Sequence, residues 1–251
     1  MINFDNNIFK LGLKTVPYKW KNFIILCSSG VDSIAASHFF INKINTHNYK
    51  QNNVGLMHSV ATLHFNHNLR PQNNVMAESY RDFCRSIRTF PFVENLNCAD
   101  STENQSRKQR LKILNEHHNT IFISAHHLDD CVESYLLNVL RGKEGFIPIP
   151  FMTKLDNLSS CVIHPFLFTR KTDFIKYAEK NDLMKYVVED ETNKQVKGSR
   201  RNLMRNKIIP ILNEEKMGLQ KIVKKKLKER LMLELINIYF LKILHIEICF
   251  Q

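Results

Sequence analysis

The sequence predicts an α/β protein with an open, mainly parallel sheet, helices on both faces and a C-terminal helical extension. An unbroken apolar run, residues 23–27, is typical of a strand buried on both faces. Strand-like and helix-like segments then alternate as far as residue 141, the order that builds parallel sheets. From residue 199 onward the patterns are helical, which predicts the extension.

The elements follow from the periodicity of apolar residues. Apolar, β-branched segments predict the strands, and Pro91 weakens the third of them, because proline cannot donate a ladder hydrogen bond. Apolar positions at helical spacing predict the helices. The expected strands are 23–27, 60–65, 90–93, 120–124 and 161–164. The expected helices are 34–40, 75–86, 101–118, 129–141, 171–181, 199–212 and 214–230, with an amphipathic packing helix over 231–250.

These elements divide the chain into four parts. Residues 1–22 are expected to be a short polar lead-in, and residues 23–165 an α/β domain that contains the predicted sheet. Residues 166–213 are expected to be a helical part, and residues 214–251 a basic, then apolar, helical tail. Residues 142–160 show no periodicity and are expected to be irregular.

The chain is strongly basic. Its net charge of +12 and pI near 9.4 make a polyanion such as nucleic acid a plausible partner, although a solvated basic surface would look the same. Its six cysteines are scattered without a C-x-x-C pair, so we expect buried thiols in a reducing compartment. No targeting segment is apparent, and charges interrupt the apolar tail, which argues against a membrane span.

A small-residue loop, 28–33, joins the first strand to the following helix. It reads Ser-Ser-Gly-Val-Asp-Ser, so hydroxyls, a glycine and a helix N-terminus meet at one point. This arrangement suits a phosphate-binding loop, and an ordinary strand–turn–helix connection fits the same residues. No Gly-Lys-Ser/Thr follows, so the loop is not of the Walker type.

A second polar stretch, 124–134, lies where another strand becomes a helix. His126 and Asp130 are four residues apart, as are Asp129 and Glu133, so each pair can share a helix face. A histidine and an aspartate on one face can bind a divalent ion, stabilise a phosphoryl group or move a proton. Acidic residues that merely suit the helix dipole are the alternative reading.

Taken together, the two motifs resemble the pyrophosphatase-loop adenylating enzymes. Further segments in the same order are similar to those of the tRNA(Ile)-lysidine synthase family. They are His-Phe-Asn-His-Asn-Leu-Arg at 64–70, Arg-Lys-Gln-Arg-Leu at 107–111, Leu-Arg-Gly at 140–142, Glu-Asp-Glu-Thr-Asn at 189–193, Arg-Asn-Leu-Met-Arg at 201–205 and Ile-Pro-Ile-Leu at 209–212. The chain departs from the family at Ser29 and Asn68, which replace glycines, and at Leu111, Glu191 and Ser134.

The resemblance implies a fold of the adenine nucleotide alpha hydrolase type, which is Rossmann-like, and a defined reaction. ATP, with Mg²⁺, would adenylate the C2 oxygen of the wobble cytidine in a tRNA(Ile) with a CAU anticodon. The side-chain amine of L-lysine would then displace AMP to give lysidine.

The resemblance also implies roles for individual residues. The catalytic residues would be Asp32, His126, Asp130, Arg107 and Arg110, with Asp32 also the magnesium ligand. The ATP-binding residues would be Ser28, Ser29, Gly30, Val31, Asp32, Ser33, His64 and Asn66. The tRNA-binding residues would be Arg141, Arg200, Arg201, Arg205 and Lys207.

Three other readings stay open. A catalytically impaired tRNA-binding homologue fits the departure at Ser29. A sulfur-transferring tRNA-modifying enzyme of the same superfamily would normally use paired cysteines, and a small-molecule ligase of the same fold would not need the basic charge. We also expect a possible homodimer through the C-terminal tail, and a location in the cytoplasm or in a plastid stroma.

Overall fold

The computed structural model describes residues 1–16, 21–51, 59–67, 71–96, 103–143, 147, 149–189 and 199–248. The chain divides into two compact units, each described by itself. Unit 1 comprises residues 1–127 and 150–195, and unit 2 comprises residues 128–149 and 196–251. The four-part division expected from the sequence stays a prediction.

Unit 1 is built on a six-stranded sheet with the order β3-β2-β1-β4-β6-β5. Its strands are β1 (Asn22–Leu26), β2 (Ser59–Asn66), β3 (Phe90–Asn95), β4 (Thr120–Ile123), β5 (Met152–Lys154) and β6 (Cys161–Ile163). Every pair is parallel except β5 with β6. The predicted open, mainly parallel sheet is therefore confirmed, with Pro91 on the edge strand β3, where it costs little.

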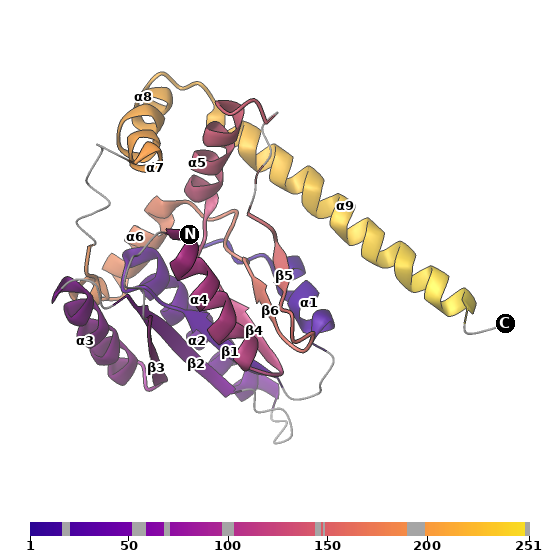
Figure 1. Ribbon diagram of the computed structural model, residues 1–251, viewed down its shortest axis with the longest axis horizontal. Helices are drawn as coiled ribbons and strands as arrows, with labels where there is room; N and C mark the ends of the chain where they lie inside the picture. Colours follow the sequence, from indigo (N-terminus) through magenta and orange to yellow (C-terminus); the bar gives the residue numbers. More distant parts are fainter. Residues whose placement is uncertain are drawn as a thin grey trace. The chain divides into compact units, whose positions relative to one another are not determined.

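The helices of unit 1 are α1 (Asn6–Thr15), α2 (Val31–Gln51), α3 (Pro71–Ser86), α4 (Glu103–Glu116), α6 (Lys171–Lys180) and the 3₁₀ turn η1 (Met184–Tyr186). They cover both faces of the sheet. Successive side chains of β1 point to opposite faces of the sheet, so Phe23 packs against Phe40 of α2, whereas Ile24 packs in the cluster that contains Leu114 of α4. Figure 1 shows α4 crossing the near face.

Two expectations for unit 1 are wrong. The polar lead-in contains α1, because Asp5 caps the helix and its apolar stripe buries Ile8 and Leu11. The irregular segment 142–160 contains β5, whose short antiparallel pairing with β6 leaves too few residues for a visible period.

Helix α1 packs closely against the far half of the sheet. A Cβ placed on Gly12 would lie 2.9 Å from Cγ2 of Ile163 and 3.3 Å from Cγ2 of Ile121. Backbone hydrogen bonds hold the preceding segment, from Asn3 to Thr169 Oγ1 and from Asp5 to the carbonyl of Pro165. Glycine is therefore required here for close approach.

Unit 2 is helical. It comprises α5 (Leu128–Val139), α7 (Arg200–Leu203), the π-helical turn η3 (Met204–Ile208), α8 (Ile209–Glu214) and α9 (Leu219–Ile248). The two helices expected over 214–250 form the single helix α9. Within the described ranges, no helix is both long and apolar enough to cross a membrane.

Replacing Gly12 with valine should lower the free energy of unfolding by about 2 kcal/mol, because the added methyl groups overpack a buried contact. Lys14→Val is the control, since Lys14 is exposed on the same helix and the change costs only helix propensity. Denaturant unfolding measures both. Equal destabilisation by the two variants would contradict the close packing of α1.

Candidate functional site at the carboxyl ends of β1 and β4

The loop between β1 and α2 is held by its own hydroxyl groups. The Ser33 hydroxyl accepts a hydrogen bond from the Ser28 backbone N–H at 3.0 Å and donates one to the Gly30 carbonyl at 2.9 Å. The Ser28 hydroxyl lies 3.2 Å from that of Ser33. Since α2 begins at Val31, its first backbone N–H groups face out of the helix, as anion binding requires.

Ser29 adopts the backbone conformation that the motif assigns to glycine. Its φ is +64°, in the left-handed region. Its buried hydroxyl donates to the Met76 carbonyl of α3 at 2.8 Å, and its own carbonyl accepts from the Val188 N–H at 3.0 Å. The Ser29 hydroxyl is therefore engaged by α3, and the predicted ATP-binding role of Ser29 concerns its backbone.

Asp32 lies in the first turn of α2 and has two basic neighbours. Its Oδ2 is 3.4 Å from Nε2 of His127 and 3.3 Å from Nζ of Lys171. Burial alone would raise the pKa of Asp32, but the hydrogen bond and charge of His127 and the charge of Lys171 outweigh it and hold that pKa below the usual value. Its other oxygen, Oδ1, is buried without a hydrogen-bond partner among the described residues.

His64 supports the loop from β2. Its Nδ1 lies 2.8 Å from the Cys27 carbonyl, and its ring stacks on Tyr80 with centroids 5.1 Å apart. Burial lowers the pKa of His64. Because a carbonyl oxygen can only accept, Nδ1 carries the proton of this hydrogen bond. Asn66, also buried, donates to Asn74 Oδ1 at 3.4 Å.

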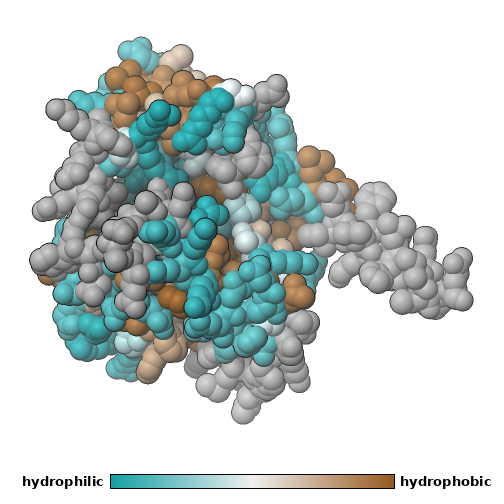
Figure 2. Space-filling model, viewed as in Figure 1, coloured by the Kyte–Doolittle hydropathy of each residue, from teal (hydrophilic) through white to brown (hydrophobic). Residues whose placement is uncertain are grey.

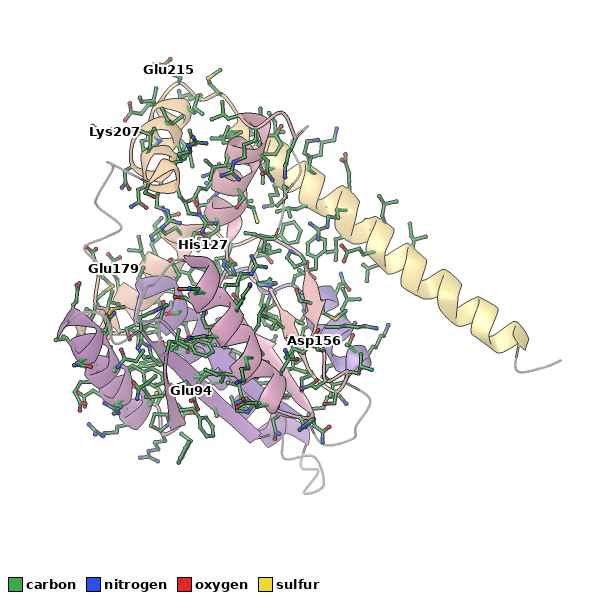
Figure 3. The ribbon with its side chains drawn as sticks, in the orientation of Figure 1. Glu94, His127, Asp156, Glu179, Lys207 and Glu215 are labelled. Atoms are coloured by element: carbon green, nitrogen blue, oxygen red, sulfur yellow. The ribbon has the colours of Figure 1, made fainter. Side chains whose placement is uncertain are left out.

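Two adjacent histidines follow β4. His127, labelled in Figure 3, is buried and faces Asp32. His126 is exposed, and its Nδ1 lies 2.7 Å from the Ser124 hydroxyl and 3.2 Å from Nδ1 of His164, which follows β6. Helix α5 begins at Leu128, so the expectation that His126 shares a helix face with Asp130 is wrong: His126 precedes the first turn.

In unit 2, two arginines hold the acidic face of α5. Arg205 donates from Nε to Glu133 Oε2 at 2.9 Å and from a terminal nitrogen to Asp130 Oδ1 at 3.2 Å. Arg201 pairs with the other oxygen of Glu133. Glu133 is 1% exposed, and burial raises its pKa although both arginines oppose the rise. Gln220 of α9 donates to Asp129.

The remaining predicted residues lie on surfaces. Arg107 is exposed and Arg110 half-buried on α4, while Arg141, Arg200 and Lys207 are exposed in unit 2. Figure 3 shows Lys207 on the side of η3 that faces away from α5. Figure 2 shows apolar surface at the top of the view, over α8. Leu203 of α7 and Ile211 of α8 are exposed.

Some predicted features lie outside the described residues. They are Asn68 to Arg70, the first two residues of the helix expected over 101–118, and Asp190 to Asn193.

The sequence did not predict that Lys171 and His164 belong to the site, or that His127 contacts Asp32. His127 was visible as the second member of a histidine pair, and the alternation of buried and exposed neighbours could have singled it out. Lys171 and His164 carried no local signal, because each meets its partner only through the tertiary fold.

The strand order reverses between β1 and β4, and both loops follow the carboxyl ends of these strands. Open α/β sheets bind their ligands at such a switch point. Here it brings together hydroxyls, helix N–H groups and imidazoles, which can hold an anionic phosphate, beside the carboxylate of Asp32. Among the described residues, no group of three or more His, Cys, Asp or Glu side chains has the arrangement of a metal site.

Residues 4–212 match the family model described as the PP-loop domain. The chain belongs to the PP-loop family. We call residues 28–33, which follow β1 and lie within this match, the PP-loop.

Curated relatives of this PP-loop chain carry the name tRNA(Ile)-lysidine synthase. One from Coxiella burnetii is 31% identical over 200 residues, covering 76% of this chain and 41% of the relative. One from Wigglesworthia glossinidia brevipalpis is 29% identical over 217 residues, covering 82% of this chain and 52% of the relative. The chain thus spans about half the length of these relatives.

A solved structure confirms the PP-loop fold. The U34-tRNA thiolase of Methanococcus maripaludis, with its [4Fe-4S] cluster, superposes with a TM-score of 0.60 over 90% of this chain and 78% of that one, at 13% identity. At this identity the likeness concerns the fold alone.

Ser29→Ala should lower the free energy of unfolding by about 1–2 kcal/mol, because it removes the buried hydrogen bond to the Met76 carbonyl and keeps the left-handed backbone. Ser29→Gly loses the same bond but removes the backbone strain, so its stability should stay within about 1 kcal/mol of the parent. Denaturant unfolding compares the two. A glycine variant as unstable as the alanine variant would contradict the conformation of Ser29.

Asp32 should make stability depend on pH in a definite sense. Because its folded-state pKa is lowered, its contribution is present above the unfolded pKa of about 4 and is lost as pH falls through the folded value. Between pH 5 and pH 3 the stability difference between the parent and Asp32→Asn should therefore shrink. Urea unfolding at several pH values measures it, and a constant difference would contradict the lowered pKa.

Proposed function

We propose that this chain carries the catalytic part of a tRNA(Ile)-lysidine synthase. The observation that supports this most is the combination at the switch point: a PP-loop after β1 and a histidine pair after β4, in a chain whose named relatives are lysidine synthases. The proposed reaction uses ATP and L-lysine to convert the wobble cytidine of a tRNA(Ile) with a CAU anticodon to lysidine.

The PP-loop is proposed to bind the phosphates of ATP. Ser28, Gly30, Val31 and Ser33 would contribute hydroxyl and backbone N–H donors, which suits a polyanion at a helix N-terminus. Ser29 serves the loop through its backbone, and its hydroxyl anchors the loop to α3. His64 positions the loop through the Cys27 carbonyl, and Asn66 stays an ATP-binding prediction.

Asp32 fits the proposed magnesium ion. Its Oδ1 is buried and lacks a hydrogen-bond partner among the described residues, as expected of an oxygen reserved for a cation. Carboxylate oxygens are the ligands that Mg²⁺ prefers, usually one or two of them with phosphate oxygens. When bound, the ion would neutralise phosphate charge.

In the proposed reaction, the C2 oxygen of cytidine attacks the α-phosphorus and pyrophosphate leaves. The side-chain amine of lysine then attacks C2, the C2–O bond breaks with release of AMP, and the amine gives up a proton. His126, an exposed imidazole that follows β4, is the candidate acceptor of that proton. Asp130 is the second candidate, and Arg107 or Arg110 would stabilise phosphate charge.

The surface arginines and lysine are proposed to contact the tRNA backbone. Arg141, Arg200 and Lys207 are exposed, as phosphate contacts require. Arg201 and Arg205 are engaged with carboxylates of α5, so their proposed contribution to tRNA binding includes shaping this part of unit 2. The homodimer through the tail and the location in cytoplasm or plastid stroma stay predictions.

His126→Ala or Asp130→Ala should reduce lysidine formation at least about 100-fold, because each removes a proposed proton-transfer group, while tRNA binding changes little. Mass analysis of nucleosides from tRNA(Ile), after incubation with ATP and lysine, measures the product, and filter binding measures the tRNA complex. His118→Ala is the control, since His118 is exposed and precedes β4.

Activity that survives both substitutions would show that these residues do not have the proposed roles. Folded parent protein that makes no lysidine, and shows no tRNA-dependent exchange of pyrophosphate into ATP, would contradict the proposed function and favour a binding homologue.

A further inference from the structure

The PP-loop carries no cation of its own. Its residues, 28–33, contain hydroxyls, N–H groups and the carboxylate of Asp32, but no lysine or arginine. A nucleoside triphosphate bound here would bring several negative charges close to this carboxylate, and like charges repel strongly in a partly buried site. A Walker loop solves this problem with a lysine inside the loop, so a PP-loop needs its cation from elsewhere in the fold.

Lys171 is in the right place to supply that cation. It is the first residue of α6, and its Nζ lies 3.3 Å from Oδ2 of Asp32. The helix that carries it is fixed by buried packing. Phe174 is fully buried against Phe166, with ring centroids 5.6 Å apart, and also meets His127. The position of Lys171 is thus set by the core of unit 1.

The ammonium group of Lys171 is also able to exchange partners. Its side chain is 44% exposed, whereas that of Asp32 is 24% exposed. An ion pair with one exposed partner is weak, and the four-carbon stem of lysine reorients easily. An incoming cation on Asp32 would therefore release the ammonium at little cost, with phosphate oxygens as its new partners.

We propose that Lys171 binds the phosphates of the nucleotide. Helix α6 supplies this lysine in place of the one that the loop lacks, and Asp32 pairs with its ammonium group before the nucleotide binds. This inference rests on the proposal that ATP is the bound nucleotide. The test uses ATP binding by the free protein, without tRNA or lysine, so a failure to make lysidine would not affect its outcome.

Lys171→Met should raise the dissociation constant of ATP with Mg²⁺ at least tenfold in calorimetry, because it removes the cation and keeps most of the length of the side chain. Binding of adenosine, which has no phosphates, should change less than twofold in an NMR titration. Lys171→Arg should keep most of the ATP affinity. Lys176→Met is the matched control, because Lys176 is exposed on the same helix.

An unchanged ATP affinity in Lys171→Met would overturn the proposal. Equal weakening of ATP and adenosine would also overturn it, because it would show that Lys171 only maintains the shape of the loop.

A second measurement on the parent protein avoids variants that do not fold. Saturating ATP with Mg²⁺ should protect Lys171 severalfold from an amine-reactive reagent, as read by peptide mass, and should leave the labelling of Lys176 unchanged. Equal labelling of Lys171 with and without ATP would count against the proposal.

Discussion

The reversal of strand order between β1 and β4 is the constraint on which the candidate site depends. Because β1 and β4 are paired in parallel, the loops that follow them leave the same edge of the sheet side by side. Asp32 and His127 come from these two loops and meet across them at 3.4 Å. The chemistry of the site is therefore a consequence of sheet topology, since the sequence separates its two halves by almost a hundred residues.

Much of the fold and part of the candidate site could be predicted from the sequence, and the features that could not be predicted depend on tertiary packing. The apolar runs predicted five of the six described strands, because short segments rich in apolar and β-branched residues are a local signature of a strand. The loop and the histidine pair were visible because small residues and polar clusters follow those runs. The contacts of Ser29 with Met76 and of Asp32 with Lys171 were invisible, because both depend on how α3 and α6 pack.

The arginines of the segment 201–205, in unit 2, stabilise the fold of this unit as well as being proposed tRNA contacts. The sequence suggested that its arginines serve the tRNA, yet Arg201 and Arg205 surround the buried carboxylate of Glu133. A buried acid without such partners would be costly. The π-helical turn that contains Arg205 widens the helix at this point, and such turns often occur at functional sites. Net charge therefore overstates the positive surface that is free to meet a polyanion.

The close packing of α1 has a consequence for the order in which the chain can fold. Asn3 bonds to Thr169, 166 residues away, and Gly12 lies against Ile163 of β6. During synthesis, α1 leaves the ribosome long before these partners exist. Its apolar stripe cannot be buried against the sheet until the last strands of the sheet have been synthesised. Completion of unit 1 is thus a late, long-range event, and a slow one by the usual relation between contact separation and rate.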